Sequence, residues 1–178
     1  MGNYSYEEMN QLASDVSVGS DGLFVLPFGN GAERILENKN IGAHIKGLQF
    51  NIHQNAHVFR AIQEGIACSL KYGTDIMNNI GVSASVIRAG KANLFLSDLF
   101  QEVVANLTGA TIELYDTDGS QGAARGAGIG ASYYNLHNAF GGLNLLKSIE
   151  PNHKIKEQYQ QLYQNWKEHL NEELHESL

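Results

Sequence analysis

A short turn in the middle of the chain carries residue types that suit contact with a phosphate or a ribose. Ile87 to Asn93 has the sequence Ile-Arg-Ala-Gly-Lys-Ala-Asn and is expected to connect a strand to a helix. Ala and Gly leave its backbone bare, so a ligand can approach the main chain, and the start of the following helix offers unpaired N–H groups. Turns of this kind are also common without any ligand, so these residues alone leave both interpretations open.

A second glycine-containing turn, Asp116 to Gly122, also follows a predicted strand. Asp118 or Ser120 is suited to cap the helix after it, and capping alone accounts for either residue. Gly126 to Ala131 formally matches the dinucleotide-binding fingerprint. That match starts inside the predicted helix, whereas the fingerprint requires the strand-to-helix turn itself, so we reject it. The absence of a G-x-x-x-x-G-K-[ST] motif excludes a P-loop enzyme.

Other patterns of catalytic or metal-binding residues are weak. His53 and His57 are four residues apart and could chelate a metal, but no third ligand lies near them in the sequence. A surface or capping role is favoured, and no metal site is predicted. No G-x-S-x-G elbow frames a serine, so no catalytic triad is predicted. The single cysteine, Cys68, is expected to be a small core residue.

The elements that position these turns alternate between helices and strands. Helices are predicted from about Tyr6 to Asp15, Gln54 to Ile80, Ser97 to Leu107 and Ser120 to Asn138, followed by a C-terminal helix with the apolar stripe Ile155, Tyr159, Leu162, Trp166, Leu170 and Leu174. Strands are predicted at Gly22–Pro27, Ala43–Leu48, Val82–Arg88 and Thr111–Tyr115, with a loop over Phe28–Asn40. This order predicts an α/β fold.

Capping residues and glycines refine the helix predictions. Ser97 can cap the third helix and Gly109 can close it, while Gly81 is placed to end the second. Gly122, Gly126 and Gly130 fall four residues apart on one helix face. Because a helix face made of glycines has no side chains, it predicts close packing of that helix against a sheet or another helix. The C-terminal stripe predicts a helix docked on its own domain.

Composition limits the class of protein. The 178 residues suit one domain, and 43% hydrophobic with 17% charged residues is typical of a globular chain. The net charge of -7 argues against nucleic acid or an anionic membrane as a partner. No apolar run reaches the roughly 18 residues of a membrane span. Met1–Glu8 lacks the features of a signal peptide, so the expected location is the cytoplasm.

Several ordered motifs resemble those of the FGGY carbohydrate kinases. Ala43–Leu48, then eight residues, then His57–Glu64 is similar to the family's C-terminal signature, with Gln63 at a usually apolar position. Asp21–Phe28 with Gly31–Arg34 resembles the stretch "GLxFLPYLxGER". The turn Ala89–Asn93 and the segment Gly122–Ala127 resemble the "GGxxxN" turn and the "ALGAA" helix. The resemblance covers about Tyr6 to Asn138.

The resemblance implies a fold and an activity. Ile87–Asn93 and Glu113–Ser120 are most similar to the xylulokinases of this family, which implies phosphorylation of D-xylulose on its 5-hydroxyl with MgATP. The family's fold has two actin-like, ribonuclease-H-like domains, each a mixed sheet flanked by helices, with the active site between them. Residues 1–178 resemble the second, C-terminal domain only, on the nucleotide side of the cleft.

The same resemblance assigns roles to single residues. Ala89 and Gly90 correspond to the glycine pair near the ATP phosphates, Asn93 to an asparagine that faces adenine, and Lys91 adds a possible phosphate contact. Ala89 replaces a usual glycine. The general base and most sugar contacts belong to the family's N-terminal domain, so no catalytic residue is assigned here. The chain is expected to be inactive without that domain, which is its expected partner together with ATP, Mg²⁺ and the sugar.

Three alternatives stay open from the sequence. The kinase could act on another substrate of the family: ribulose, fuculose, rhamnulose, gluconate or glycerol. The chain could instead be a nucleotide-binding actin-like module without catalysis, or a purely structural α/β domain. Oligomeric state is not predicted.

Overall fold

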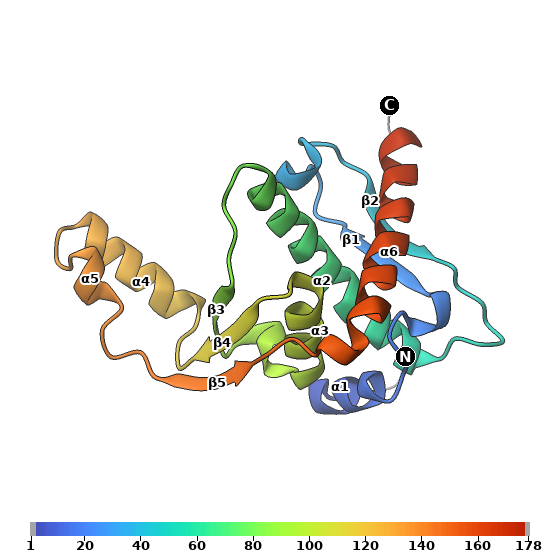
Figure 1. Cartoon of the computed structure of the whole chain (residues 1–178), viewed down its shortest axis with the longest axis horizontal. Helices are drawn as coiled ribbons and strands as arrows, with labels where there is room; N and C mark the ends of the chain where they lie inside the picture. The colour runs from blue at the N-terminus through green and yellow to red at the C-terminus, as the bar shows by residue number, and fades with distance from the viewer. Residues whose placement is uncertain (1–2, 177–178) are drawn as a thin grey trace.

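The computed structural model describes residues 3–176. Outside that range lie Ser177, Leu178 and the first two residues of the N-terminal segment considered for a signal peptide, Met1 and Gly2. Its helices are α1 (Tyr6–Ser14), α2 (Asn55–Asn79), α3 (Asp98–Thr108), α4 (Gly119–Gly130), α5 (Leu136–Ala139) and α6 (Lys156–Glu176). Its strands are β1 (Phe24–Phe28), β2 (Gly42–Lys46), β3 (Val86–Gly90), β4 (Thr111–Tyr115) and β5 (Leu145–Ile149) (Figure 1). Within the described residues, no helix is long and apolar enough to cross a membrane.

The strands form two separate sheets. β1 and β2 pair antiparallel. β3 and β4 pair in parallel, and β5 pairs antiparallel with the other side of β4. The parallel pair is connected through α3, as parallel neighbours require a crossover. The predicted α/β fold with a mixed sheet and flanking helices is therefore confirmed.

Local signals in the sequence set most element ends. The Ser97 hydroxyl accepts from the Phe100 N–H at the start of α3, and Gly109 ends that helix in the left-handed region at φ 72°. Gly81 follows α2 with φ 85°. The loop predicted over Phe28–Asn40 contains one short 3-10 turn, Arg34–Leu36. The strand predicted over Val82–Arg88 is shifted, since β3 begins at Val86 and continues to Gly90.

The core is built from buried side chains of the helices α2, α3 and α6 and of the strands β1 and β4. Its largest fully buried side chains include Trp166, Phe100, Leu23, Leu26, Ile112, Leu114 and Leu170. The apolar stripe of α6 thus docks on its own domain, as predicted. Cys68 is buried as well, and burial raises the pKa of its thiol.

Two predictions for the region after β4 are wrong. The single helix expected over Ser120–Asn138 is interrupted after Gly130, where Ser132 has φ 58°, and α5 begins only at Leu136. The glycine face is not packed, because a Cβ at Gly122, Gly126 or Gly130 would meet nothing within 4 Å. Figure 1 shows α4 and α5 extending away from the rest of the molecule.

The strand β5 was absent from the sequence prediction. Leu145 and Leu146 are about half exposed, so this strand lacks the alternation of buried and exposed residues that marks a strand in a sequence. Pairing with β4 sets its conformation, and the register shifts between Leu114 and Tyr115.

One backbone carbonyl fixes how both long helices lie on β1. A Cβ placed on Gly65 of α2 would collide with the carbonyl oxygen of Val25. The same oxygen accepts a hydrogen bond from the indole N–H of Trp166 in α6 at 2.9 Å. Glycine at position 65 is thus required by the close approach of α2 to the strand.

We predict opposite effects for alanine at two glycines of α2. Gly65→Ala is expected to lower the free energy of unfolding by about 1–3 kcal/mol, because the methyl group overpacks the contact with Val25. Gly73→Ala is the matched control and should raise it by about 0.5–1 kcal/mol, because nothing lies within 4 Å of the added Cβ and alanine favours the helix. Urea unfolding followed by circular dichroism measures both. Equal stabilities of the two variants would contradict the close approach.

Candidate functional site

The parallel pair β3 and β4 brings the two candidate turns to the same edge of the sheet. Gly90, at the end of β3, lies opposite Tyr115, at the end of β4. The segments after both strands therefore leave the sheet side by side. In open α/β sheets, ligands bind outside the carboxyl ends of parallel strands, which makes this edge the candidate site.

The turn after β3 is held by its own backbone. The Lys91 N–H donates to the Tyr115 carbonyl at 2.9 Å, and the Ala92 N–H donates to the Gly90 carbonyl at 2.8 Å. Asn93 adopts φ 52°, a left-handed conformation that asparagine tolerates better than most residues, and begins a 3-10 turn that ends at Leu96. Its side chain is exposed.

The turn after β4 is held by carboxylates. Asp118 caps α4, since its Oδ1 accepts from the Gln121 N–H at 2.9 Å and from the Ser120 hydroxyl at 2.7 Å. Asp116 accepts two hydrogen bonds from Asn144, at the start of the β5 segment. These bonds lower the pKa of both aspartates, so both stay negatively charged. The capping role expected for Asp118 is confirmed.

The two turns touch at Gly90. A Cβ at this position would collide with the carbonyl oxygen of Thr117. Arg125 donates to the Thr117 hydroxyl at 2.8 Å and so fixes the opposing turn. Packing between the turns by itself therefore requires glycine at position 90.

A cleft of about 460 Å³ opens beside this contact. Its walls are the turn after β3, the start of α4 and the middle of α2, through Ala89, Gly90, Ala92, Asn93, Leu94, Phe95, Phe100, Asp118, Gly119, Ile66 and Leu70. A second cleft, of about 530 Å³, lies across the same strand ends and is lined by Arg88, Ala89, Gly90, Tyr115, Thr117, Phe140 and Leu143. Both volumes fall in the usual range of ligand pockets, roughly 300–1,000 Å³.

The structure brings together three of the four residues expected to contact ATP. Ala89, Gly90 and Asn93 line the first cleft, whereas the exposed Lys91 does not. The methyl group of Ala89 packs against the buried core. The pKa of Asp98 is lowered, chiefly by a hydrogen bond from Lys147 and to a smaller extent by the charge of Lys91.

Sequence reasoning missed the opposite walls of the cleft. From the sequence, Asp118 is assigned only to helix capping, and Gly119, Ile66 and Leu70 receive no role in a site. The sequence did contain a signal for these walls, because two glycine-containing turns each follow a predicted strand. If those two strands are parallel neighbours, their turns meet at the same edge of the sheet.

The segment His57–Glu64, which resembles the kinase signature, does not line the clefts but holds α2 in place. Arg60 donates to Glu64 at 2.7 Å and to the Val16 carbonyl at 2.6 Å, and Glu64 accepts from the Gly19 N–H at 3.1 Å. All four groups lie buried or partly buried. This network ties α2 to the segment that leads into β1.

Gln63, the departure from the family pattern, is satisfied in its buried position. Its side-chain oxygen accepts from the Ser97 hydroxyl at 2.8 Å, and its amide nitrogen donates to Asn10 at 3.1 Å. Because Ser97 directly follows the turn that lines the cleft, Gln63 links α2 to the end of that turn.

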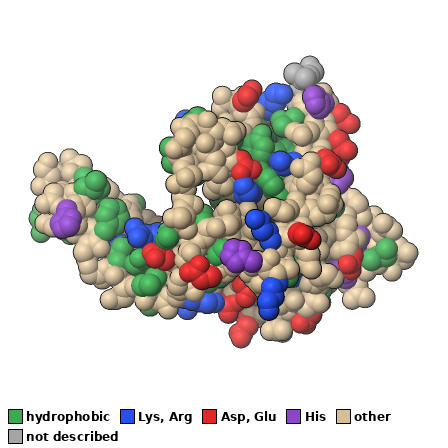
Figure 2. All heavy atoms as spheres, in the orientation of Figure 1, with side chains coloured by type: hydrophobic (Ala, Val, Ile, Leu, Met, Phe, Trp, Pro, Cys, Tyr) green, Lys and Arg blue, Asp and Glu red, His purple; other side chains and the backbone are tan. Residues whose placement is uncertain are grey.

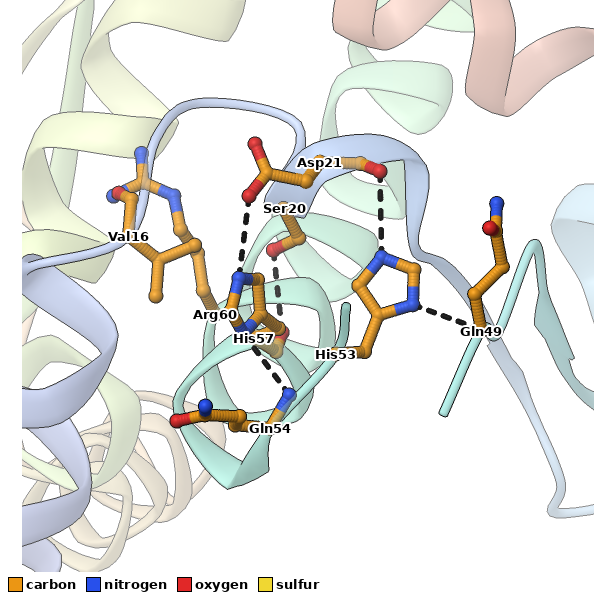
Figure 3. Close-up of polar contacts among 8 residues, drawn as sticks. All are labelled: Val16, Ser20, Asp21, Gln49, His53, Gln54, His57 and Arg60. Atoms are coloured by element: carbon orange, nitrogen blue, oxygen red, sulfur yellow. Dashed lines mark hydrogen bonds and ion pairs between the residues drawn. The ribbon is translucent and has the colours of Figure 1, made fainter. Parts of the chain in front are cut away.

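The two histidines considered as metal ligands hold a strained turn instead. Asp21, at φ 52°, lies between them (Figure 3). The Nδ1 atoms of His53 and His57 accept from the N–H groups of Gln49 and Gln54. The proton of each ring therefore lies on Nε2. The His53 Nε2–H donates to the backbone oxygen of Asp21, and the His57 Nε2–H donates to the Asp21 carboxylate. The capping interpretation is confirmed for His57, because Gln54 is the N-cap of α2.

Metal-ligating side chains do not gather elsewhere in the described region. Among residues 3–176, no three His, Cys, Asp or Glu side chains are placed to hold a metal ion together.

Comparison with curated proteins shows similarity over almost the whole chain. A xylulose kinase of Haemophilus influenzae is 29% identical over 179 residues, 96% of this chain and 35% of that protein. The L-xylulose/3-keto-L-gulonate kinase of Escherichia coli is 30% identical over 175 residues, 95% of this chain and 34% of that protein. This chain is similar to FGGY carbohydrate kinases. It spans about a third of the length of these relatives, and no family model matches it.

Solved structures show the same fold. A ligand-bound xylulose kinase of Lactobacillus acidophilus superimposes with a TM-score of 0.76 at 23% identity, covering 96% of this chain and 35% of that one. Plasmodium falciparum glycerol kinase with ADP gives a TM-score of 0.71 at 18% identity, covering 96% of this chain and 34% of that one. The actin-like fold expected from the sequence is confirmed.

We predict that Gly90→Ala separates the two turns of the site. The added methyl group is expected to cost about 1–3 kcal/mol of unfolding free energy, because it must displace the backbone of Thr117. Gly119→Ala, at the start of α4, is the control, since its Cβ would meet nothing within 4 Å. Thermal unfolding of both variants provides the comparison, and a Gly90→Ala protein as stable as Gly119→Ala would disprove the contact.

Proposed function

We propose that this chain is the C-terminal, nucleotide-side domain of an ATP-dependent carbohydrate kinase. The substrate proposed is D-xylulose, converted to D-xylulose 5-phosphate. The observation that carries this proposal is similarity along 95–96% of the chain to sugar kinases of about three times its length. The cleft at the carboxyl ends of β3 and β4 supports it, because that is where this class of fold binds ligands.

The proposed nucleotide site consists of Ala89, Gly90, Lys91 and Asn93. The apolar floor made by Ile66 and Leu70 suits a purine ring. The exposed ammonium group of Lys91, next to the cleft, suits a phosphate. Asp116 and Asp118 are negatively charged, so we place the phosphates toward Lys91 and away from these carboxylates. Mg²⁺ is expected to bind with the nucleotide, where it would neutralise phosphate charge.

The chain supplies only part of the reaction. Phosphoryl transfer depends mainly on alignment and charge neutralisation. The general base and most sugar contacts are expected from an N-terminal domain of the parent protein, and closure of the two domains would align the hydroxyl with the γ-phosphate. The chain alone is therefore expected to bind nucleotide without turning it over.

The first test is ADP release by the full-length parent with MgATP and a panel of sugars and polyols. Turnover on D-xylulose well above the other compounds is the expected result. The 178-residue chain serves as the matched control and should release no ADP. A well-folded parent that turns over none of the compounds would refute the kinase proposal and favour a non-catalytic nucleotide-binding module.

A second prediction concerns Asn93. In the parent, Asn93→Asp is expected to raise the KM for ATP about tenfold while changing the KM for sugar little, because the hydrogen bond that the Asn93 amide donates to adenine is lost. Asn79→Asp, at the exposed end of α2, is the control. Steady-state kinetics with each substrate varied in turn gives both constants. An unchanged KM for ATP would remove Asn93 from the site.

A kinase for another substrate is the second candidate. One relative is named for L-xylulose and 3-keto-L-gulonate, and a similar structure is a glycerol kinase. Since the sugar contacts are expected in the N-terminal domain, ribulose, fuculose, rhamnulose, gluconate and glycerol belong in the same panel.

A further inference from the structure

The 3-10 turn Asn93–Leu96 carries the asparagine of the proposed nucleotide site in a left-handed conformation. A residue other than glycine keeps such a conformation where the surrounding structure holds it. Two backbone hydrogen bonds close the turn: the Phe95 N–H donates to the Ala92 carbonyl at 3.1 Å, and the Ser97 N–H donates to the Leu94 carbonyl at 3.0 Å. Because 3-10 hydrogen bonds have poor geometry, support from other elements decides where the asparagine lies.

Within this turn, Phe95 is the residue that packs against the buried core. Its ring meets the buried ring of Phe100 edge to face, with 5.3 Å between the ring centroids. The neighbouring Leu94 and Leu96 are 39% and 61% exposed. The position of the turn therefore depends on how Phe95 is held.

The side chain of Gln101, on α3, holds Phe95 from the buried side. Gln101 is fully buried. Its Nε2 donates to the Phe95 carbonyl at 2.8 Å, and its Oε1 accepts from the ammonium group of Lys147 at 2.8 Å. This orientation of the amide is required, because a carbonyl only accepts and an ammonium group only donates. A buried amide is costly unless it is hydrogen-bonded, and here both of its ends are.

Lys147 is itself held in place, so Gln101 is fixed at both ends. Lys147 lies on β5, and its Nζ also donates to the Asp98 carboxylate at 2.8 Å. That bond lowers the pKa of Asp98, which therefore stays ionised at neutral pH. The amide of Gln101 thus connects β5, α3 and the turn.

Gln63 of α2 supports the end of the turn. Its side-chain oxygen accepts from the hydroxyl of Ser97, which directly follows the turn, in a buried hydrogen bond. The same hydroxyl oxygen accepts from the Phe100 N–H and so caps α3. Because Gln63 and the cap hold Ser97, loss of the Gln101 bond is expected to release Phe95 without unfolding α3.

The cleft that the turn borders lies in an open part of the molecule. Figure 2 shows the surface hollowed between the arm formed by α4 and α5 and the main body. Asp118 and Gly119, where that arm begins, line the same cleft as Asn93. A turn that borders a cleft is packed on its buried side alone, so its position depends on bonds from that side.

We propose that Gln101 is a positioning residue of the nucleotide site. By holding the Phe95 carbonyl, it sets the place of Asn93, two residues earlier in the same turn. The inference rests on the proposed function, since it takes Asn93 to face adenine. Gln101 does not line the cleft, so it acts through the turn and not through contact with the nucleotide.

Gln101→Glu in the full-length parent tests the bond to Phe95. The ammonium group of Lys147 keeps the new carboxyl ionised, so the contact with Lys147 remains while the hydrogen donated to the Phe95 carbonyl is lost. The KM for ATP should rise about tenfold. The KM for sugar and kcat should change less than about twofold, because contacts to adenine bind substrate and transition state alike.

Hydrogen exchange measures the turn directly and without nucleotide. The Phe95 and Ser97 amides should exchange at least about tenfold faster in Gln101→Glu than in the wild-type parent, because both bond within the turn. Gln101→Met has a similar volume and no charge, and it removes the same bond. It should change exchange and KM in the same direction, and it replaces the glutamate variant if that variant does not fold.

Val103→Ala on the same helix is the control for general destabilisation. Val103 is fully buried and does not line the cleft, so its loss should lower the melting temperature of the parent. The exchange of the turn amides and the KM for ATP should stay as in the wild type. A rise in the KM for ATP as large as that of Gln101→Glu would overturn the inference, because loosening of α3 would then explain both.

ADP release and ATP binding by the same samples keep the two proposals separate. An active parent whose turn amides, or whose ATP binding, are unchanged by Gln101→Glu would overturn the inference and leave the kinase proposal standing. Faster exchange with about tenfold weaker ATP binding in equilibrium dialysis, in a parent without turnover, would do the reverse. A parent that binds no ATP would overturn both.

Discussion

The carbonyl oxygen of Val25 sets the position of both long helices on the strand beneath them. It leaves no room for a side chain at Gly65 of α2, and it accepts the indole N–H of Trp166 from α6. Because the buried faces of α2 and α6 pack against the same strand, this contact also determines where the opposite face of α2 lies. That face carries Leu70, which forms part of the floor of the cleft.

A second close contact gives the site its shape. The backbones of the turns after β3 and β4 touch at Gly90 and Thr117, so the cleft beside them has walls from two turns and one helix. The same region is open on two sides: along the free edge of β3, and toward the arm of α4 and α5. The chain spans about a third of the length of its kinase relatives.

Sequence patterns predicted elements well where the cause is local. The cap at Ser97, the terminal glycine at Gly109 and the apolar stripe of α6 act within a few residues, and all appear as expected. The ATP residues Ala89, Gly90, Lys91 and Asn93 came from family resemblance. Three of them share a cleft, and their contact with nucleotide stays a prediction. The sequence misled where spacing was taken for packing, as at Gly122 and Gly126, because a small helix face permits a close neighbour without supplying one.

By itself, the sequence determined most of the alternation of helices and strands, the buried stripe of α6, the core position of Cys68, and the resemblance to carbohydrate kinases. These depend on residue type and short-range spacing, which are visible in one dimension. Only the tertiary structure decided that β3 and β4 are parallel neighbours, that their turns meet at Gly90, and that Gln63 bonds to Ser97 and Asn10. It also decided that β5 joins the sheet and that β3 keeps an open edge. Each of these facts concerns groups distant in the chain, whose contact depends on how whole elements pack and not on the residues around either one.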